Sequence, residues 1–196
     1  MSGFDAIYCY PGTHILINRL GLLDADQLDL VERRIVVQRL AEGPPSGDFD
    51  LAHLRAIHRH LFQDIYDWAG ELREVEIAKG GHGFMPRRFI ATGMFDVHDR
   101  IVRADGLRGL DAEGFARAAG EIIGDVNHIH PFREGNGRTQ IEYLRQLAAR
   151  GGHAIDVRRL NGERWYAASR AAHLADYAPM AAAIGTAIVS PRPDRP

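Results

Sequence analysis

Apolar residues recur at helical spacing along most of the chain, with polar residues between them. A first helix is expected to begin after Asp24, which can cap its N-terminus, and to end near Gly43. Its apolar face would carry Leu28, Val31, Ile35 and Val36. The same spacing predicts further helices at about residues 50–68, 88–104, 111–130 and 139–150, and one or two between residues 161 and 189, broken near Pro179. The pattern therefore predicts a mostly α protein.

One segment departs from this helical pattern. Leu72, Val75 and Ile77 alternate with charged residues, and Gly80-Gly81 follows them closely. Two extended arms around a glycine turn are typical of a β-hairpin. We therefore expect a short β-hairpin, called the flap here, at about residues 72–88.

Composition narrows the class of protein. The chain has 196 residues, of which 45% are apolar, and a formal net charge of −2. This favours a single domain over residues 1–196 and argues against a dedicated nucleic-acid binder, which usually shows a basic face. Cys9 is the only cysteine, so an intramolecular disulfide and a thiolate metal cluster are excluded. With no signal peptide and no apolar run of about 18–20 residues, we expect a cytoplasmic protein that contacts no membrane.

The run of residues 130–138, His-Pro-Phe-Arg-Glu-Gly-Asn-Gly-Arg, carries the strongest chemical signal. Gly135 and Gly137 flank Asn136 directly before a predicted helix. Glycines let backbone N–H groups converge on a ligand, and a helix N-terminus attracts anions. Arg138 opens the helix and can grip phosphate oxygens in pairs. Together these features predict a phosphate site.

Two further residues of the run add chemistry to that site. A carboxylate beside a phosphate repels it unless a cation lies between them, so Glu134 is the expected Mg²⁺ ligand. His130 titrates near neutral pH and is the expected general base. Arg133 either adds positive charge at the entry of the loop or pairs with Glu134. The alternative is a polar loop without chemistry, in which His130 caps the preceding helix and Arg138 pairs with Glu134.

Histidines in two closely spaced pairs could either bind a metal ion or have structural roles. His58 and His60 form one His-x-His pair, and His128 and His130 form another. A metal site would need additional ligands in a suitable geometry. Structural roles are therefore the favoured interpretation for His58, His60 and His128.

Residues 130–138 resemble, at every position, the signature His-x-Phe-x-(Asp/Glu)-Gly-Asn-Gly-Arg of the Fic family. Residues 65–73 and 77–81 resemble the segment that leads into the flap of that family. Residues 10–13, Tyr-Pro-Gly-Thr, resemble the start of compact bacterial Fic toxins. The resemblance implies a Fic-like helical bundle with a short β-hairpin flap.

Within that bundle, the resemblance implies a core at about residues 50–155, with the flap at about 72–88 and the active-site loop at 130–138. It also implies transfer of AMP from ATP, with Mg²⁺, to a Ser, Thr or Tyr hydroxyl of a target protein. The resemblance implies that His130 acts as the base, that Phe132 anchors the loop and that Glu134 binds Mg²⁺. Around the phosphates it places Gly135, Asn136 and Gly137, with Arg133 and Arg138 as positive charges. Lys79 and Gly80 would lie near the nucleotide. Residues 75–86 would clamp the target chain.

The sequence departs from the family at two points. Ile141 stands where many members carry a second arginine that binds the γ-phosphate. No segment resembles the inhibitory motif (Ser/Thr)-x-x-x-Glu-(Gly/Asn), so a separate small antitoxin is expected to supply inhibition. By analogy with compact toxins, the target would be a subunit of a bacterial topoisomerase.

Three functions are weighed on this basis. The leading one is a protein adenylyltransferase acting as the toxin of a toxin–antitoxin pair. The second is transfer of another group, either phosphate or another nucleotide-linked moiety, and the third is a non-catalytic scaffold that binds a partner. A secreted effector is the alternative to a cytoplasmic location.

Overall fold

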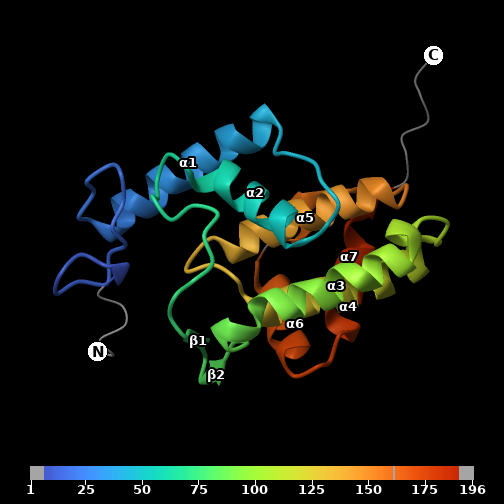
Figure 1. Cartoon of the computed structure of the whole chain (residues 1–196). Coiled ribbons are helices and arrows are strands. Elements are labelled where there is room, and N and C mark those ends of the chain that lie inside the picture. Colours follow the sequence, from blue (N-terminus) through green and yellow to red (C-terminus); the bar gives the residue numbers. More distant parts are fainter. Residues whose placement is uncertain (1–6, 161, 190–196) are drawn as a thin grey trace, which may run out of the picture.

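The computed structural model describes residues 7–160 and 162–189. Within these ranges the chain forms seven α-helices, shown in Figure 1. They are α1 (Ala25–Glu42), α2 (Leu51–Phe62), α3 (Ile90–Arg103), α4 (Ala112–Ile129), α5 (Asn136–Arg150), α6 (Glu163–His173) and α7 (Ala178–Ala187). Short 3-10 turns lie at η2 (Arg87–Phe89), η3 (Asp105–Leu107) and η4 (Val157–Leu160). The prediction of a mostly α fold is confirmed.

Aspartate side chains begin three of these helices. Asp24 accepts a hydrogen bond from the Gln27 N–H at 2.8 Å, at the start of α1. Asp50 at α2 and Asp111 at α4 do the same for the N–H three residues on. Each carboxylate satisfies a donor that has no partner inside the helix. The first helix and the one after Asp111 therefore begin where the sequence predicted.

Two helix boundaries differ from the prediction. α2 ends at Phe62 rather than at residue 68, although Ile65 and Tyr66 are buried. The apolar spacing continues because residues 63–69 fold into turns that still face the core. α5 begins at Asn136, three residues before the predicted start.

The core is built around α4, which packs against α3, α5, α6 and α7. Its buried face includes Phe115, Ala119, Ile123 and Val126. α2 packs against α5 on one side and α1 on the other, and Figure 1 shows α1 and α2 side by side. α6 and α7 are separated at residues 174–177, and Pro179 lies in the first turn of α7, where a proline is tolerated. None of the helices in the described part of the chain is long and apolar enough to cross a membrane.

The flap is a very short antiparallel ladder. β1 (Ala78–Lys79) pairs with β2 (His82–Gly83), with Lys79 opposite His82. Gly80 and Gly81 connect the strands with φ of 60° and 83°. Two consecutive positive φ values fit the tight hairpin turn that glycines favour. The predicted hairpin is thus confirmed.

A second strand pair was not predicted from the sequence. β3 (Ala154–Ile155) pairs with β4 (Ile188–Val189) and brings the end of α7 next to the segment after α5. The prediction of one short β element was therefore wrong. Two-residue strands are too short to show the alternation from which strands are recognised.

Candidate active site

His130 is the residue at which α4 ends. Its φ of 46° and ψ of 65° are left-handed, and its N–H donates to the Val126 carbonyl at 3.1 Å. This conformation turns the chain out of the helix ahead of Pro131. The His130 Nδ1 lies 3.2 Å from the Asn127 carbonyl oxygen. Because a carbonyl only accepts, Nδ1 carries the proton and Nε2 holds the free lone pair.

The surroundings of His130 keep its imidazole neutral. Burial lowers the pKa of His130 to about 4; the hydrogen bond to Asn127 opposes this shift, and the charges of Arg73 and Lys79 add to it. Phe84, which follows β2, stacks on the imidazole with ring centres 3.7 Å apart. At neutral pH the unprotonated Nε2 is therefore available to accept a proton.

Arg73 connects the flap to the active-site loop. Its side chain is fully buried, and its Nε donates to the His130 carbonyl at 2.8 Å. Its two other nitrogens donate to the carbonyls of Val75 and Met85, one on each arm of the flap. The backbone N–H of Arg73 also donates to the Pro131 carbonyl. One buried side chain thus fixes both arms of the flap relative to His130.

The loop after His130 is held by its own residues. Phe132 is completely buried, which fits the predicted anchor of the loop. The Asn136 side chain accepts from the Phe132 N–H at 3.0 Å and donates to the Phe132 carbonyl at 2.8 Å. The expectation for Asn136 is thereby refined, because its side-chain oxygen and one of its two amide hydrogens close the loop.

The two glycines of the loop differ in their surroundings. At Gly135, where φ is 83°, a Cβ would lie 2.5 Å from the Phe62 ring. A side chain at this position would therefore meet both steric overlap and backbone strain. At Gly137 a Cβ would meet no atom within 4 Å. The backbone of the first turn of α5 is therefore open to a ligand at Gly137.

Glu134 and Arg138 lie close together at the mouth of the loop. The Glu134 side chain is half exposed, and its Oε1 accepts from the Gly135 N–H at 2.9 Å and lies 3.7 Å from Arg138 Nη2. Arg138 covers the Phe62 ring at 4.8 Å. A half-exposed carboxylate beside a phosphate site suits Mg²⁺, which keeps several waters and is commonly held by one or two carboxylates together with substrate phosphates.

The remaining predicted residues lie around this centre. Lys79 on β1 is exposed, and its Nζ lies 5.2 Å from the ring centre of Tyr166 on α6. Gly80 occupies the exposed flap turn. The Arg133 guanidinium lies 6.0 Å from the ring centre of Tyr8, so it faces the N-terminal segment. The structure thus places His130 and Glu134 at the loop, with Arg138 in the first turn of α5, and Arg133 against another part of the chain.

His58 has a structural role, as predicted. Its Nδ1 accepts from the Gly70 N–H at 2.8 Å, and its Nε2–H donates to the Glu134 carbonyl at 3.0 Å. Its ring stacks on Phe132 at 3.9 Å. Burial lowers the pKa of His58 to about 4, which keeps the ring neutral in these contacts.

Other histidines gather beneath the flap. His128 Nδ1 lies 3.3 Å from His173 Nδ1, and the ring of His82 lies 5.7 Å from that of His173. Even so, no group of three or more His, Cys, Asp or Glu side chains suited to a metal ion occurs among residues 7–160 and 162–189. These contacts join the flap to α4 and α6.

Sequence reasoning missed three residues of the site: Glu32, Tyr66 and Arg73. Arg138 forms an ion pair with Glu32 of α1, and the Tyr66 hydroxyl also donates to Glu32. The only sequence signal was the position of Glu32 on the apolar face of its helix, four residues after Leu28 and four before Val36. Arg73 gave no signal beyond its place at the end of a segment that resembles the family.

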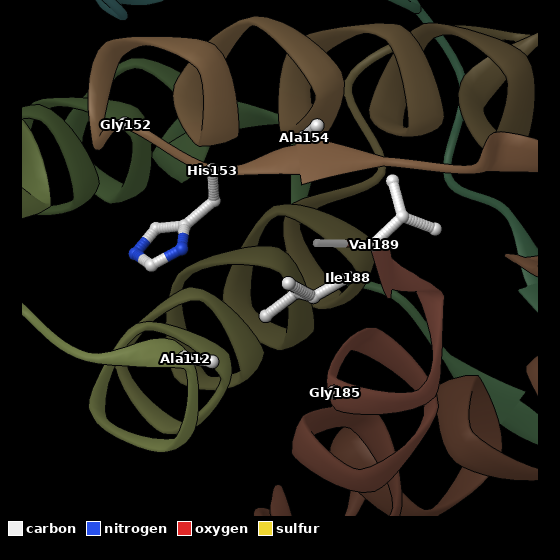
Figure 2. A pocket seen from close by; sticks show the side chains of 7 residues that line it. All are labelled: Ala112, Gly152, His153, Ala154, Gly185, Ile188 and Val189. Carbon is white, nitrogen blue, oxygen red and sulfur yellow. The ribbon is translucent and has the colours of Figure 1, made fainter. Parts of the chain in front are cut away.

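A pocket of about 320 Å³ lies elsewhere on the molecule, between the start of α4, α7 and the β3–β4 pair. Its lining is Ala112, Gly152, His153, Ala154, Gly185, Ile188 and Val189, as Figure 2 shows. His153 is the one titratable side chain in this lining, and its Nε2 donates to the Leu110 carbonyl at 3.0 Å. The pocket shares no lining residue with the loop or the flap, so it is separate from the candidate site.

Comparison with known proteins gives consistent results. A model described as the Fic/DOC family matches residues 48–148. A relative from Sinorhizobium fredii, named probable protein adenylyltransferase y4lH, is 40% identical over 177 residues, which cover 90% of this chain and 92% of the relative.

Two solved structures share the fold. The BepC protein of Bartonella tribocorum, with bound AMPPNP, has a TM-score of 0.88 at 24% identity and covers 97% of this chain and 100% of its own. The N-terminal Fic domain of a VirB-translocated effector protein from Bartonella quintana, with bound ADP, has a TM-score of 0.87 at 26% identity. It covers 96% of this chain and 97% of its own.

Proposed function

The chain belongs to the Fic/DOC family, and from that premise we propose that it is a protein adenylyltransferase, which transfers AMP from ATP to a hydroxyl side chain of another protein. The observation that carries the proposal is the state of His130: a neutral imidazole with its free Nε2 immediately before a loop built to hold phosphate. The name of the Sinorhizobium fredii relative and the nucleotides in the two Bartonella structures support it.

The proposed reaction is a displacement at the α-phosphorus of ATP. The target hydroxyl oxygen forms a bond to the α-phosphorus, and the bond from that phosphorus to the oxygen bridging to the β-phosphate breaks. His130 Nε2 takes the hydroxyl proton, and pyrophosphate leaves with the electron pair. This step uses His130 as the general base.

The loop and the first turn of α5 would hold the triphosphate. The backbone of Gly135, Asn136 and Gly137 would lie against the phosphates together with the positive end of the α5 dipole. The N–H groups of Asn136 and Gly137 would donate to them, since the Gly135 N–H already donates to Glu134. Arg138 binds the β- and γ-phosphate side and stabilises charge on pyrophosphate as it departs. Glu134 would hold Mg²⁺, which would supply positive charge to offset that of the phosphates.

The flap would hold the target. We propose that a segment carrying a Ser, Thr or Tyr hydroxyl lies along residues 75–86 and pairs with the flap through its main chain. Lys79 and Gly80 would then lie near the nucleotide. By analogy with compact toxins, we propose a bacterial topoisomerase subunit as the target.

Regulation is proposed to come from another chain. Since no inhibitory motif occurs in this sequence, a small antitoxin protein would supply the inhibitory helix. The reaction is proposed to take place in the cytoplasm, where ATP is abundant. Expression of the chain with and without the gene next to its own would test the antitoxin, because growth arrest should occur only when that gene is absent.

A second candidate function, transfer of a group other than AMP, is favoured by the residue at position 141. Ile141, at the position of the second arginine in many members, is partly buried and packs against the core. Arg145, one turn further on, is engaged with Glu142 at 2.7 Å. Of residues 138, 141 and 145 on α5, only Arg138 is therefore placed to grip the γ-phosphate, and transfer of another group becomes the competing reaction.

The experiment supplies a cell lysate with ATP labelled at either the α- or the γ-phosphate. Protein labelling from the α position alone supports AMP transfer, whereas labelling from γ alone supports a phosphotransferase. His130→Ala should lower the labelling rate by about 10²–10⁴-fold, as expected for loss of a general base. His153→Ala serves as the control and should label like the wild type. Undiminished labelling by His130→Ala would exclude the proposed base.

A further inference from the structure

Glu32 is a charged residue in a place normally filled by an apolar one. It lies on the face of α1 that packs against the rest of the protein, and only 7% of its side chain is exposed. A buried carboxylate is costly unless it is paired and hydrogen-bonded. The contacts of Glu32 should therefore explain why it is there.

Both contacts lead to the phosphate site. Glu32 Oε1 pairs with Nη2 of Arg138, and Oε2 accepts the hydroxyl proton of Tyr66. Burial, followed by the charge of Glu32, raises the pKa of Tyr66, so its hydroxyl stays protonated and remains a donor. Tyr66 is itself held by stacking on Trp68, with ring centres 4.3 Å apart.

The Arg138 guanidinium is thereby held by Phe62 and Glu32, while Glu134 Oε1 lies 3.7 Å from its Nη2. Phe62 lies under it at 4.8 Å, and Glu32 engages Nη2. A guanidinium has five N–H donors, and Nη2 supplies two of them, so at least three remain for phosphate oxygens. An arginine held in advance loses less conformational entropy when it binds its ligand.

We propose that Glu32 is a positioning residue: with Tyr66, it holds Arg138 in the orientation that receives the β- and γ-phosphates of the nucleotide. The proposal rests on the proposed function, in which Arg138 binds that end of ATP. Glu32 lies outside residues 48–148, which the family model matches. α1 would thus be a working part of the nucleotide site as well as a covering helix.

A role for Glu32 as a competitor of phosphate predicts the opposite change in nucleotide affinity. If Glu32 competed with phosphate for Arg138, its removal would tighten nucleotide binding. If it positions Arg138, its removal weakens binding of ligands that carry a β-phosphate and leaves AMP unaffected. Comparison of AMPPNP with AMP therefore separates the two roles.

The experiment measures the affinity of the full chain for AMPPNP and for AMP, each with Mg²⁺, by calorimetry. Glu32→Ala should weaken AMPPNP binding about tenfold, the loss expected for one charge-assisted contact, and change AMP binding less than about twofold. Tyr66→Phe should weaken AMPPNP binding by a smaller factor, and Glu32→Gln should restore part of the loss. Asp29→Ala, which removes a carboxylate from the exposed face of the same helix, is the matched control and should change neither affinity.

Arg138→Ala separates failure of this inference from failure of the proposed function. If Arg138→Ala weakens AMPPNP binding and Glu32→Ala does not, the positioning role is wrong and the assignment of Arg138 stands. Tighter AMPPNP binding by Glu32→Ala, or equal weakening of AMPPNP and AMP, would also overturn the inference. If Arg138→Ala leaves AMPPNP binding unchanged, the phosphate assignment fails and the inference fails with it. Should Glu32→Ala not fold, Glu32→Gln and Tyr66→Phe decide the question by the same comparison.

Discussion

At the scale of single residues, the site depends on protonation and on contacts that fix a few polar side chains. His130 is neutral because it is buried under Phe84, and its tautomer is set by the Asn127 carbonyl. The geometry and the lowered pKa point the same way: Nε2 is unprotonated at neutral pH, as the proposed role of general base requires. A buried histidine with a pKa near 4 also has a consequence that can be measured directly.

We predict that His130 titrates well below an ordinary histidine. Nitrogen NMR of the imidazole should show a midpoint near pH 4, with the proton on Nδ1 above it. Since the folded pKa lies below the unfolded value of about 6.5, His130 should lower the free energy of unfolding as the pH falls from about 6.5 to about 4. Phe84→Ala should expose the ring and move the midpoint upward. A wild-type midpoint near 6.5 would contradict this prediction.

The features that could be predicted from the sequence are those formed by residues that are neighbours in the chain. The hairpin turn at Gly80-Gly81 is encoded by neighbours in the chain and was predicted from their pattern. The roles assigned to residues 130–138 rest on the same kind of local pattern and stay predictions. Glu32 and Arg73 are different, because their partners lie far away in the sequence: Arg138 for one, and the His130 carbonyl for the other. Only folding reveals that these positions belong to the site.

At the scale of elements, the flap is held by polar contacts more than by its own ladder. Its strands have two residues each, and such a hairpin is only marginally stable alone. Arg73 supplies what the ladder lacks, since it joins the carbonyls of Val75 and Met85 to that of His130. Lys79 over Tyr166 and His82 beside His173 add contacts to α6.

We predict that Arg73→Met loosens the flap and destabilises the protein. Several buried carbonyls would lose their donor, at a cost of about 3–5 kcal/mol. Hydrogen exchange should become faster at residues 75–85, and the midpoint of thermal unfolding should fall. Arg103→Met, which removes an exposed ion pair on α3, is the control and should change the free energy of unfolding by less than about 1 kcal/mol. Unchanged exchange in the flap of Arg73→Met would count against this account.

At the scale of the whole molecule, the proposed nucleotide site is assembled from parts on both sides of residues 48–148, the segment that matches the family. α1 precedes residues 48–148 and reaches Arg138, while α6 follows them and supports the flap. α7 completes the arrangement, because it packs closely on α4 and its end pairs with β3. The contact between α4 and α7 therefore fixes the far side of the helix that ends at His130.

Two glycines at the contact between α4 and α7 give predictions of opposite sign for the midpoint of thermal unfolding. A Cβ at Gly120 of α4 would lie 2.8 Å from the backbone nitrogen of Ala181 on α7, so Gly120→Ala forces the two helices apart. Overpacking of this kind costs about 1–3 kcal/mol, which for a chain of this size lowers the midpoint of thermal unfolding by about 2–12 °C. A Cβ at Gly185 of α7 would meet only the Ala116 Cβ at 3.6 Å, an ordinary contact. Gly185→Ala should therefore raise the midpoint, because alanine is favoured over glycine inside a helix by about 1 kcal/mol. If the two variants shifted the midpoint in the same direction, the close approach of α4 and α7 would not be what distinguishes them.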